Sequence, residues 1–235
     1  MRIADHAAML ELARPNGAIY PTLTWDNNSL VLIDAGFPGQ AEALISAIAA
    51  EDFRAEDITH IILTHQDIDH VGCLPDLLRL APCARVIAHT EEALYIDGRK
   101  TPIKLAMLLE TCDRLPDQMK QFCDQLQEGF ANRRATISQT VEDGEVLPMA
   151  GGIEVVHTPG HTPGHIALFL QQGNIMIAGD AANLADGQLT GPNPQHTYDM
   201  AQGMQSFEKL KVYDSQGVVA YHGGFQTFSA DGAAR

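Results

Sequence analysis

Residues 63–72 read LTHQDIDHVG, which places two imidazoles and two carboxylates within six residues. The preceding run, residues 58–63 (ITHIIL), is typical of a buried strand, so the polar cluster begins where a strand ends. Bound molecules in α/β proteins gather at the carboxyl ends of strands. Imidazole and carboxylate side chains together suit divalent zinc, manganese or iron(II). The stretch therefore predicts a metal site, and its candidate ligands are His65, Asp67, Asp69 and His70.

The spacing of this cluster is informative because it is rare. For a chain with this content of Asp and His, the pattern H-x-D-x-D-H arises by chance in roughly one chain in 400. A purely structural interpretation is an acidic loop that caps the next helix, with Asp69 near the helix N-terminus. That interpretation accounts for one carboxylate and for neither histidine, so a metal site is preferred.

Three other expected strand ends also deliver side chains that can bind a metal. The β-rich runs in question are residues 153–156, 175–178 and 218–221. The candidate ligands that follow them are His161, Asp180 and His222. Packing alone does not explain metal-binding side chains at four separate strand ends. We therefore expect loops at one edge of a β-structure to assemble the site, each loop contributing one or two ligands.

The hydrophobic pattern predicts an α/β fold whose halves are separated by a helical segment. The first half alternates strands and helices, with strands at 29–34, 58–63 and 85–88 and helices from residue 40 and over 71–80. The second half is β-rich, with strands at 153–156, 166–170, 175–178 and 218–221 and a helix over 200–212. Residues 91–140 are rich in charges and helix formers, which indicates a helical insertion over the main body. Two β-rich halves indicate two sheets, and hence a sandwich with helices outside.

The order of these motifs resembles a known family. The pattern H-x-D-x-D-H-x-G, the repeat TPGHTPGH at 158–165, the pair Gly179-Asp180 and the pair His222-Gly223 are similar to the motif series of the metallo-β-lactamase superfamily. The similarity runs from about residue 30 to residue 224. It implies a four-layer αββα sandwich, here a single domain over residues 1–235 with the helical insertion at about 91–140. It also implies two divalent metal ions at one edge of the sandwich.

The resemblance assigns a role to each candidate ligand. It implies that the first ion is held by His65, Asp67 and His161, and the second by Asp69, His70 and His222. Asp180 would bridge the two ions. His165 is expected to form a supporting hydrogen bond rather than to bind metal, and His196, in a Pro-rich loop, is either a substrate contact or an ordinary loop residue.

Asp67 departs from the family pattern, which most often has His at that position. Two divalent ions, three aspartates and one hydroxide sum to zero charge, against +1 with His at position 67. A less positive site favours hard metals that prefer oxygen ligands. Zinc is the expected metal, and manganese or iron(II) should be tolerated. The alternative is that Asp67 leaves the first site weak, so that the enzyme binds one ion.

The activity implied by the resemblance is metal-assisted hydrolysis of a small ester, thioester or lactone. A metal-bound hydroxide would attack the carbonyl carbon, and Asp69, as the catalytic residue, would orient it and carry its proton to the leaving group. Two alternatives stay open. One is a phosphodiesterase of the same fold, and the other is a protein that binds metal or oxygen without catalysis.

The charge of the chain narrows the choice of partners. There are 30 acidic and 15 basic residues, which gives a net charge of −15 with His neutral. A surface this negative repels phosphate backbones and anionic lipid headgroups, so neither nucleic acid nor a membrane is expected as a partner. The expected partner is a small-molecule substrate. A homodimer is left open.

The expected location is the cytoplasm. Asp5, His6 and Glu11 interrupt the N-terminal stretch where a signal peptide needs an unbroken apolar run. An exported antibiotic-degrading enzyme is not expected for the same reason. A hydrolase of glutathione thioesters is disfavoured, because such an enzyme is expected to carry a helical C-terminal domain after the last motif.

Overall fold

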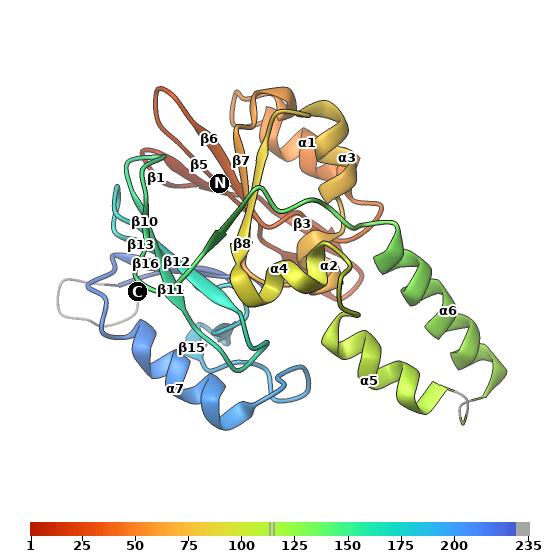
Figure 1. The fold of residues 1–235 in the computed structure, drawn as a ribbon. Helices are drawn as coiled ribbons and strands as arrows, with labels where there is room; N and C mark the ends of the chain where they lie inside the picture. Colours follow the sequence, from red (N-terminus) through yellow and green to blue (C-terminus); the bar gives the residue numbers. More distant parts are fainter. Residues whose placement is uncertain (113, 115, 229–235) are drawn as a thin grey trace.

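The computed structural model describes residues 1–112, 114 and 116–228, and in them two large β-sheets pack face to face with helices on both outer faces (Figure 1). The first sheet contains, in spatial order, β1 (Arg2–Ala4), β2 (Ala7–Met9), β5 (Thr22–Trp25), β6 (Leu30–Ile33), β7 (His60–Leu63), β8 (Arg85–His89) and β9 (Gln139–Val141). The second contains β10 (Val146–Leu147), β11 (Ile153–His157), β12 (Ile166–Leu170), β13 (Ile175–Ile177), β16 (Gly217–Ala220) and β17 (Gly224–Thr227). Two short hairpins pair β3 (Leu12–Arg14) with β4 (Gly17–Ile19) and β14 (Asn183–Ala185) with β15 (Gln188–Thr190).

The helices fall into three sets (Figure 1). Those near the first sheet are α1 (Ala41–Ala49), the short α2 (Ile68–Val71) and α3 (Leu74–Leu80). Those between β8 and β9 are α4 (Thr90–Ile96), α5 (Ile103–Cys112) and α6 (Asp117–Ala131), of which α5 and α6 lie side by side. The second sheet is covered by α7 (Met200–Leu210). Among the described helices, none is both long enough and apolar enough to cross a bilayer.

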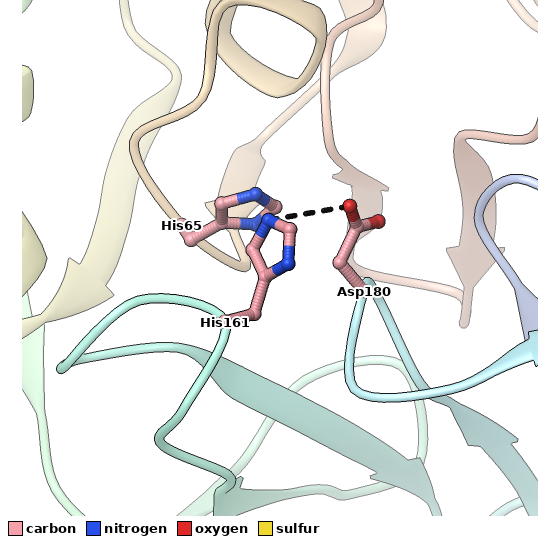
Figure 2. A group of neighbouring side chains, drawn as sticks. All are labelled: His65, His161 and Asp180. Carbon is pink, nitrogen blue, oxygen red and sulfur yellow. Dashed lines mark ion pairs between the residues drawn. The ribbon is translucent and has the colours of Figure 1, made fainter. Parts of the chain in front are cut away.

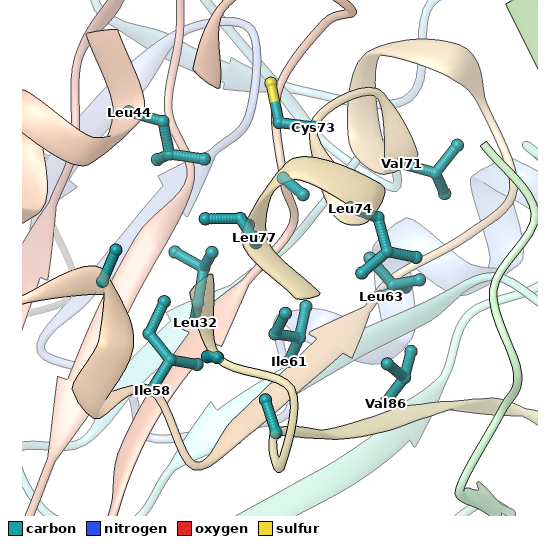
Figure 3. Close-up of a cluster of buried hydrophobic side chains, with 14 of the residues drawn as sticks. Leu32, Leu44, Ile58, Ile61, Leu63, Val71, Cys73, Leu74, Leu77 and Val86 are labelled. Atoms are coloured by element: carbon teal, nitrogen blue, oxygen red, sulfur yellow. The ribbon is translucent and has the colours of Figure 1, made fainter. Parts of the chain in front are cut away.

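The strand β6 shows why an unbroken apolar run builds the centre of this sandwich. Alternate side chains of a strand point to opposite faces of its sheet. Leu32 packs with the helices α1 and α3 on the outer face, as Figure 3 shows, whereas Val31 and Ile33 pack toward the second sheet. Both faces are buried, so the strand reads as continuously hydrophobic rather than alternating.

The other layers follow from the same rule. Between the sheets, residues of β6, β7 and β8 contact residues of β11, β12, β13 and β16 in one buried cluster. On the far face of the second sheet, Phe207 and Leu210 of α7 pack against Val156, Met176 and Val218. The order of layers is therefore helix, sheet, sheet, helix, as the sequence predicts.

The strand directions place one edge of the sandwich in position to hold a site. In the first sheet β6, β7 and β8 run parallel, so their carboxyl ends share an edge. In the second sheet β11 and β13 are both antiparallel to β12, and β13 is parallel to β16. The three strands that precede His161, Asp180 and His222 therefore also end on a common edge.

The structure differs from the sequence-based expectation in three respects. Strands of three or four residues outside the predicted runs are present, because such short strands show no clear hydrophobic period; they are β1 to β5, β14, β15 and β17. The segment 91–140 is helical as expected, but its end forms β9, which extends the first sheet beside β8. The helix expected over 71–80 is two helices, α2 and α3, with a break at residues 72 and 73.

A close approach of two loops explains the glycine at this break. A Cβ atom added to Gly72 would lie 2.3 Å from backbone atoms of Phe37 and Pro38. Such a distance is far inside van der Waals contact, so only glycine fits without moving the neighbouring loop. The glycine in the pattern H-x-D-x-D-H-x-G therefore serves packing beneath the site.

Candidate metal centre

The predicted ligands lie directly after the strands that the sequence indicates. His65 and Asp67 follow β7, and Asp69 and His70 lie in the short helix α2. The remaining candidates follow β11, β13 and β16 in turn and are His161, Asp180 and His222. The structure brings these side chains together at the shared edge of the two sheets.

Three of them form one compact group. His65, His161 and Asp180 each offer a nitrogen or oxygen atom, and these atoms all lie within 4.8 Å of one another. Figure 2 shows the two imidazoles side by side and facing the carboxylate, with His161 Nε2 3.4 Å from Asp180 Oδ2. All three residues are buried.

A second compact group lies beside the first. Asp69, His70 and His222 also offer atoms within 4.8 Å of one another. Asp69 Oδ2 is 3.3 Å from His222 Nε2 and 3.8 Å from His70 Nε2. Asp180 touches this group too, because its Oδ1 is 3.4 Å from His70 Nε2 and its Oδ2 is 3.3 Å from His222 Nε2. The Asp180 carboxylate therefore lies between the two groups.

Asp67 contacts both imidazoles of the first group. Its Oδ2 is 3.2 Å from His65 Nε2 and 3.0 Å from His161 Nε2. The same oxygen forms a salt bridge with Lys104 of α5. Asp67 and Asp180 therefore both face the imidazoles of the first group.

The electrostatics of the site favour a cation. Burial and then the neighbouring His70 lower the pKa of His65 to about 4, so this imidazole is neutral and can act as a ligand. Burial also lowers the pKa of His222, but Asp180 and Asp69 outweigh it and raise that pKa to about 9. The carboxylates therefore attract positive charge strongly enough to hold a proton on His222. Binding of a divalent ion there would release that proton.

Several buried polar atoms of the two groups lack a hydrogen-bond partner, which indicates whether a metal ion would fit there. Among the described residues, His65 Nε2, His70 Nε2 and Asp180 Oδ1 are buried side-chain atoms without a hydrogen-bond partner. Such atoms are rare in folded proteins, because an unpaired buried polar atom costs free energy. These three belong to the two compact groups. These nitrogen and oxygen atoms therefore suit the coordination of a metal ion, which would take the place of the missing hydrogen bonds.

Asp34 supports the second group and was missed by the sequence analysis. It follows β6 and accepts a hydrogen bond from His70 Nδ1 at 2.8 Å, while its Oδ1 accepts from the backbone N–H of Thr64 at 2.9 Å. The carboxylate fixes the His70 ring so that Nε2 faces Asp180. The backbone φ of Asp34 is +63°, which is unusual for a residue other than glycine. Burial lowers the pKa of His70, but Asp34 and then Asp69 outweigh it and raise that pKa well above its usual value.

Replacement of Asp34 by asparagine should weaken metal binding by about 10- to 100-fold. Asparagine tolerates the left-handed backbone, but one of the two carboxylate acceptors becomes an NH₂ donor. Dissociation constants for Zn²⁺ from competition with a coloured chelator would measure the effect. Asp52→Asn is the matched control, because Asp52 has a similar φ of +66° but is exposed. Equal affinity in the two variants would contradict the role given to Asp34.

Glu92 of α4 is a second residue that the sequence did not reveal. This fully buried carboxylate accepts hydrogen bonds from the backbone and side-chain N–H groups of Gln66, each at 2.9 Å. It also accepts from Thr162 Oγ1 at 2.7 Å and from the N–H of Gly164 at 2.9 Å. Glu92 therefore ties the loop of His65 to the loop of His161.

The two remaining predicted histidines have different surroundings. His165 is buried, and its Nε2 accepts a hydrogen bond from the backbone N–H of Asp180 at 3.0 Å while its Nδ1 lies 2.8 Å from Thr158 Oγ1. Both ring nitrogens are thus engaged within the protein. His196 is exposed and lines a cavity at the site.

This cavity opens over the candidate ligands and has a volume of about 730 Å³. Its floor includes Asp67, Asp69, Asp180 and His222. One wall is apolar and comes from α5 and α6, through Leu105, Leu108, Phe122, Leu126 and Phe130. The lining also includes polar side chains, namely Arg14, Asn183, Asn193 and His196. The helical segment between β8 and β9 therefore shapes the cavity.

Comparison with known proteins assigns the family. Residues 15–222 match the family described as the metallo-beta-lactamase superfamily. The chain belongs to this superfamily. It is 30% identical over 211 residues to the probable metallo-hydrolase YflN of Bacillus subtilis (strain 168), a match that covers 83% of this chain and 76% of that protein. A solved metallo-beta-lactamase family protein of Thermus thermophilus superposes with a TM-score of 0.72 at 23% identity, covering 95% of this chain and 75% of that one.

These matches confirm the resemblance and the αββα fold predicted from the sequence motifs. They support a metal-binding hydrolase of the metallo-β-lactamase superfamily. The chain is also 27% identical over 215 residues to the hydroxyacylglutathione hydrolase GloC of Haemophilus influenzae, covering 89% of this chain and 88% of that protein. A hydrolase with that name is thus matched over nearly its whole length. The expectation that such hydrolases carry a large additional C-terminal domain is therefore wrong for this relative.

Proposed function

We propose that this chain hydrolyses a small thioester, ester or lactone at a centre of two divalent ions. The proposal depends on one observation, the convergence of four loops on buried His and Asp atoms that lack hydrogen-bond partners. His65, Asp67 and His161 would hold one ion, and Asp69, His70 and His222 the other. The position of Asp180 between the two groups suits a bridging ligand.

Bound divalent ions would lower the pKa of a water molecule and polarise the substrate oxygen. The side chains would supply the remaining steps. Asp69 lines the cavity floor, and its Oδ2 faces both His222 and His70. It is therefore placed to orient the attacking water and to carry a proton to the leaving group. Asp34 and Glu92 would keep the ligand loops in register during the reaction.

The cavity supports an acyl substrate with an apolar portion. A wall of leucine and phenylalanine side chains from α5 and α6 can bury an alkyl or aryl group beside the ions. The polar lining residues can contact a hydrophilic leaving group. Among the three ester types, the relative GloC favours a thioester, because hydroxyacylglutathione is one.

The identity of the ions follows from the ligand atoms. Imidazole nitrogens favour zinc, and three aspartates favour harder ions. We propose zinc as the native metal, with manganese or iron(II) accepted because Asp67 stands where the family most often has histidine. Metal analysis of protein expressed without added zinc tests this, and a strict preference for zinc would contradict it.

Removal of metal should abolish hydrolysis. Dialysis against a chelator should reduce turnover of aryl thioesters, aryl esters and lactones to background, and Zn²⁺, Mn²⁺ or Fe²⁺ should restore it. Rates measured over the same panel, with bis-aryl phosphodiesters added, would identify the substrate class. Turnover of the phosphodiesters alone would replace the proposal with a phosphodiesterase. Metal-loaded protein that turned over none of the panel would indicate a metal-binding protein without catalysis.

A further inference from the structure

Lys104 places a positive charge among the atoms of the first group. It lies in the first turn of α5, far in sequence from the ligands that it contacts. Its Nζ forms a salt bridge with Asp67 Oδ2 and lies 2.9 Å from His161 Nε2. Both contacted atoms face His65 or Asp180 as well. The ammonium group therefore lies where these side chains would otherwise share a cation.

The contact with His161 is incompatible with metal binding at the same nitrogen. A neutral imidazole has one nitrogen with a free lone pair, and an ammonium group can only donate hydrogen bonds. In the tautomer that leaves His161 Nε2 unprotonated, the Lys104 ammonium group donates to that nitrogen and occupies its lone pair. An ion at the first group would have to displace the lysine.

The backbone around Lys104 is anchored to the site. The N–H of Ile103, its neighbour, donates to Gln66 Oε1 at 2.8 Å, and Gln66 is held in turn by Glu92. Leu105, on the other side, is 4% exposed. The start of α5 is therefore fixed to the loop that carries His65 and Asp67, which directs the lysine side chain toward the site.

In the part of the chain that the structure describes, no lysine or arginine is inserted among the ligand atoms of the second group. Arg14 is the basic side chain in contact with it, and its Nη1 lies 3.4 Å from His222 Nδ1. The other ring nitrogen, Nε2, faces Asp69 and Asp180. Among the described residues, no lysine or arginine side chain forms a salt bridge with the Asp69 carboxylate or a hydrogen bond with His70 Nε2.

We propose that Lys104 acts as an internal cation at the first group and makes the two ion sites unequal. The second group, with Asp180, binds its ion first and more tightly. The first group binds an ion only when Lys104 withdraws into the cavity that it also lines. This inference rests on the proposed function, because it assumes that both groups bind divalent ions. Under this proposal Lys104, together with Asp67, makes the first site the weaker of the two.

The test compares the binding stoichiometry and affinity of variants at position 104. Chelator-treated protein would be titrated with Zn²⁺ and, separately, with Mn²⁺, and bound metal measured by mass spectrometry after equilibrium dialysis. We expect one tight and one weak site in the unmodified chain. Lys104→Met keeps the length of the side chain without its charge and should tighten the weak site by about 10- to 100-fold. Lys104→Arg keeps a positive charge and should leave the two sites unequal.

The exposed Lys100, just before α5, supplies the matched control, and Lys100→Met should leave both affinities unchanged. Thermal unfolding of each variant would show that the fold is retained. Two equally tight sites in the unmodified chain would overturn the inference. An unchanged weak site in Lys104→Met would overturn it too. If no variant bound any ion, the proposed function itself would fail, which is a distinguishable result.

Discussion

Replacement of Asp180 by asparagine is expected to lower kcat/KM for thioester hydrolysis by about 10³-fold, or about 4 kcal/mol of transition-state stabilisation. Asp180 lies between the two compact groups, and contacts His161, His70 and His222. Burial raises its pKa, but these three imidazoles, His161 first, outweigh burial and hold the pKa well below its usual value. Asparagine has the same shape without the charge, so the proposed centre of two ions would lose its shared carboxylate.

Kinetics and metal content should change together in this variant. The steady-state rates would be compared with the number of ions bound per chain after dialysis against a fixed concentration of free Zn²⁺. Asp214→Asn removes an exposed aspartate away from the site and serves as the control. Full activity with a full complement of metal in Asp180→Asn would show that the carboxylate does not act as a shared ligand.

Replacement of Glu92 by alanine should lower the free energy of unfolding by about 3 kcal/mol or more and weaken metal binding by about 10- to 100-fold. Four donors of Gln66, Thr162 and Gly164 would lose their acceptor in a buried setting. Burial raises the pKa of Glu92, and these hydrogen bonds oppose that effect. The stability and the affinity should fall together, because one carboxylate connects the two ligand loops.

Denaturant unfolding of the metal-free protein would measure the change in stability without any contribution from bound ions. Glu92→Gln should give an intermediate loss, since glutamine keeps one oxygen acceptor and presents an NH₂ group to the remaining donors. Glu91→Ala, an exposed neighbour on the same helix, is the matched control. If Glu92→Ala and Glu91→Ala had equal free energies of unfolding, the role of Glu92 in connecting the loops of His65 and His161 would be excluded.

The sequence predicts the parts of the fold that depend on the hydrophobic pattern of a single strand or helix. The apolar runs of β6, β7, β8 and β12 are visible because strands buried on both faces read as continuous hydrophobic stretches. The three-residue strands β1 and β14 are not visible, because so few residues show no period. A signal for Asp34 did exist, since it is one more carboxylate at the end of a predicted strand. Glu92 and Lys104 carried no such signal, because each is an ordinary charged residue in a helical segment.

The sequence, with its resemblance to the family, thus predicted that seven candidate ligands follow strands at one edge of an αββα sandwich: His65, Asp67, Asp69, His70, His161, Asp180 and His222. An alternation of strands and helices along the chain favours parallel strands, and parallel strands deliver their carboxyl ends to the same side. Only the tertiary structure decided which atoms meet there. Glu92 lies 26 positions from Gln66 and 70 from Thr162, and Lys104 lies 37 positions from Asp67. Contacts over such separations depend on how the helices between β8 and β9 pack across the edge, which no local pattern encodes.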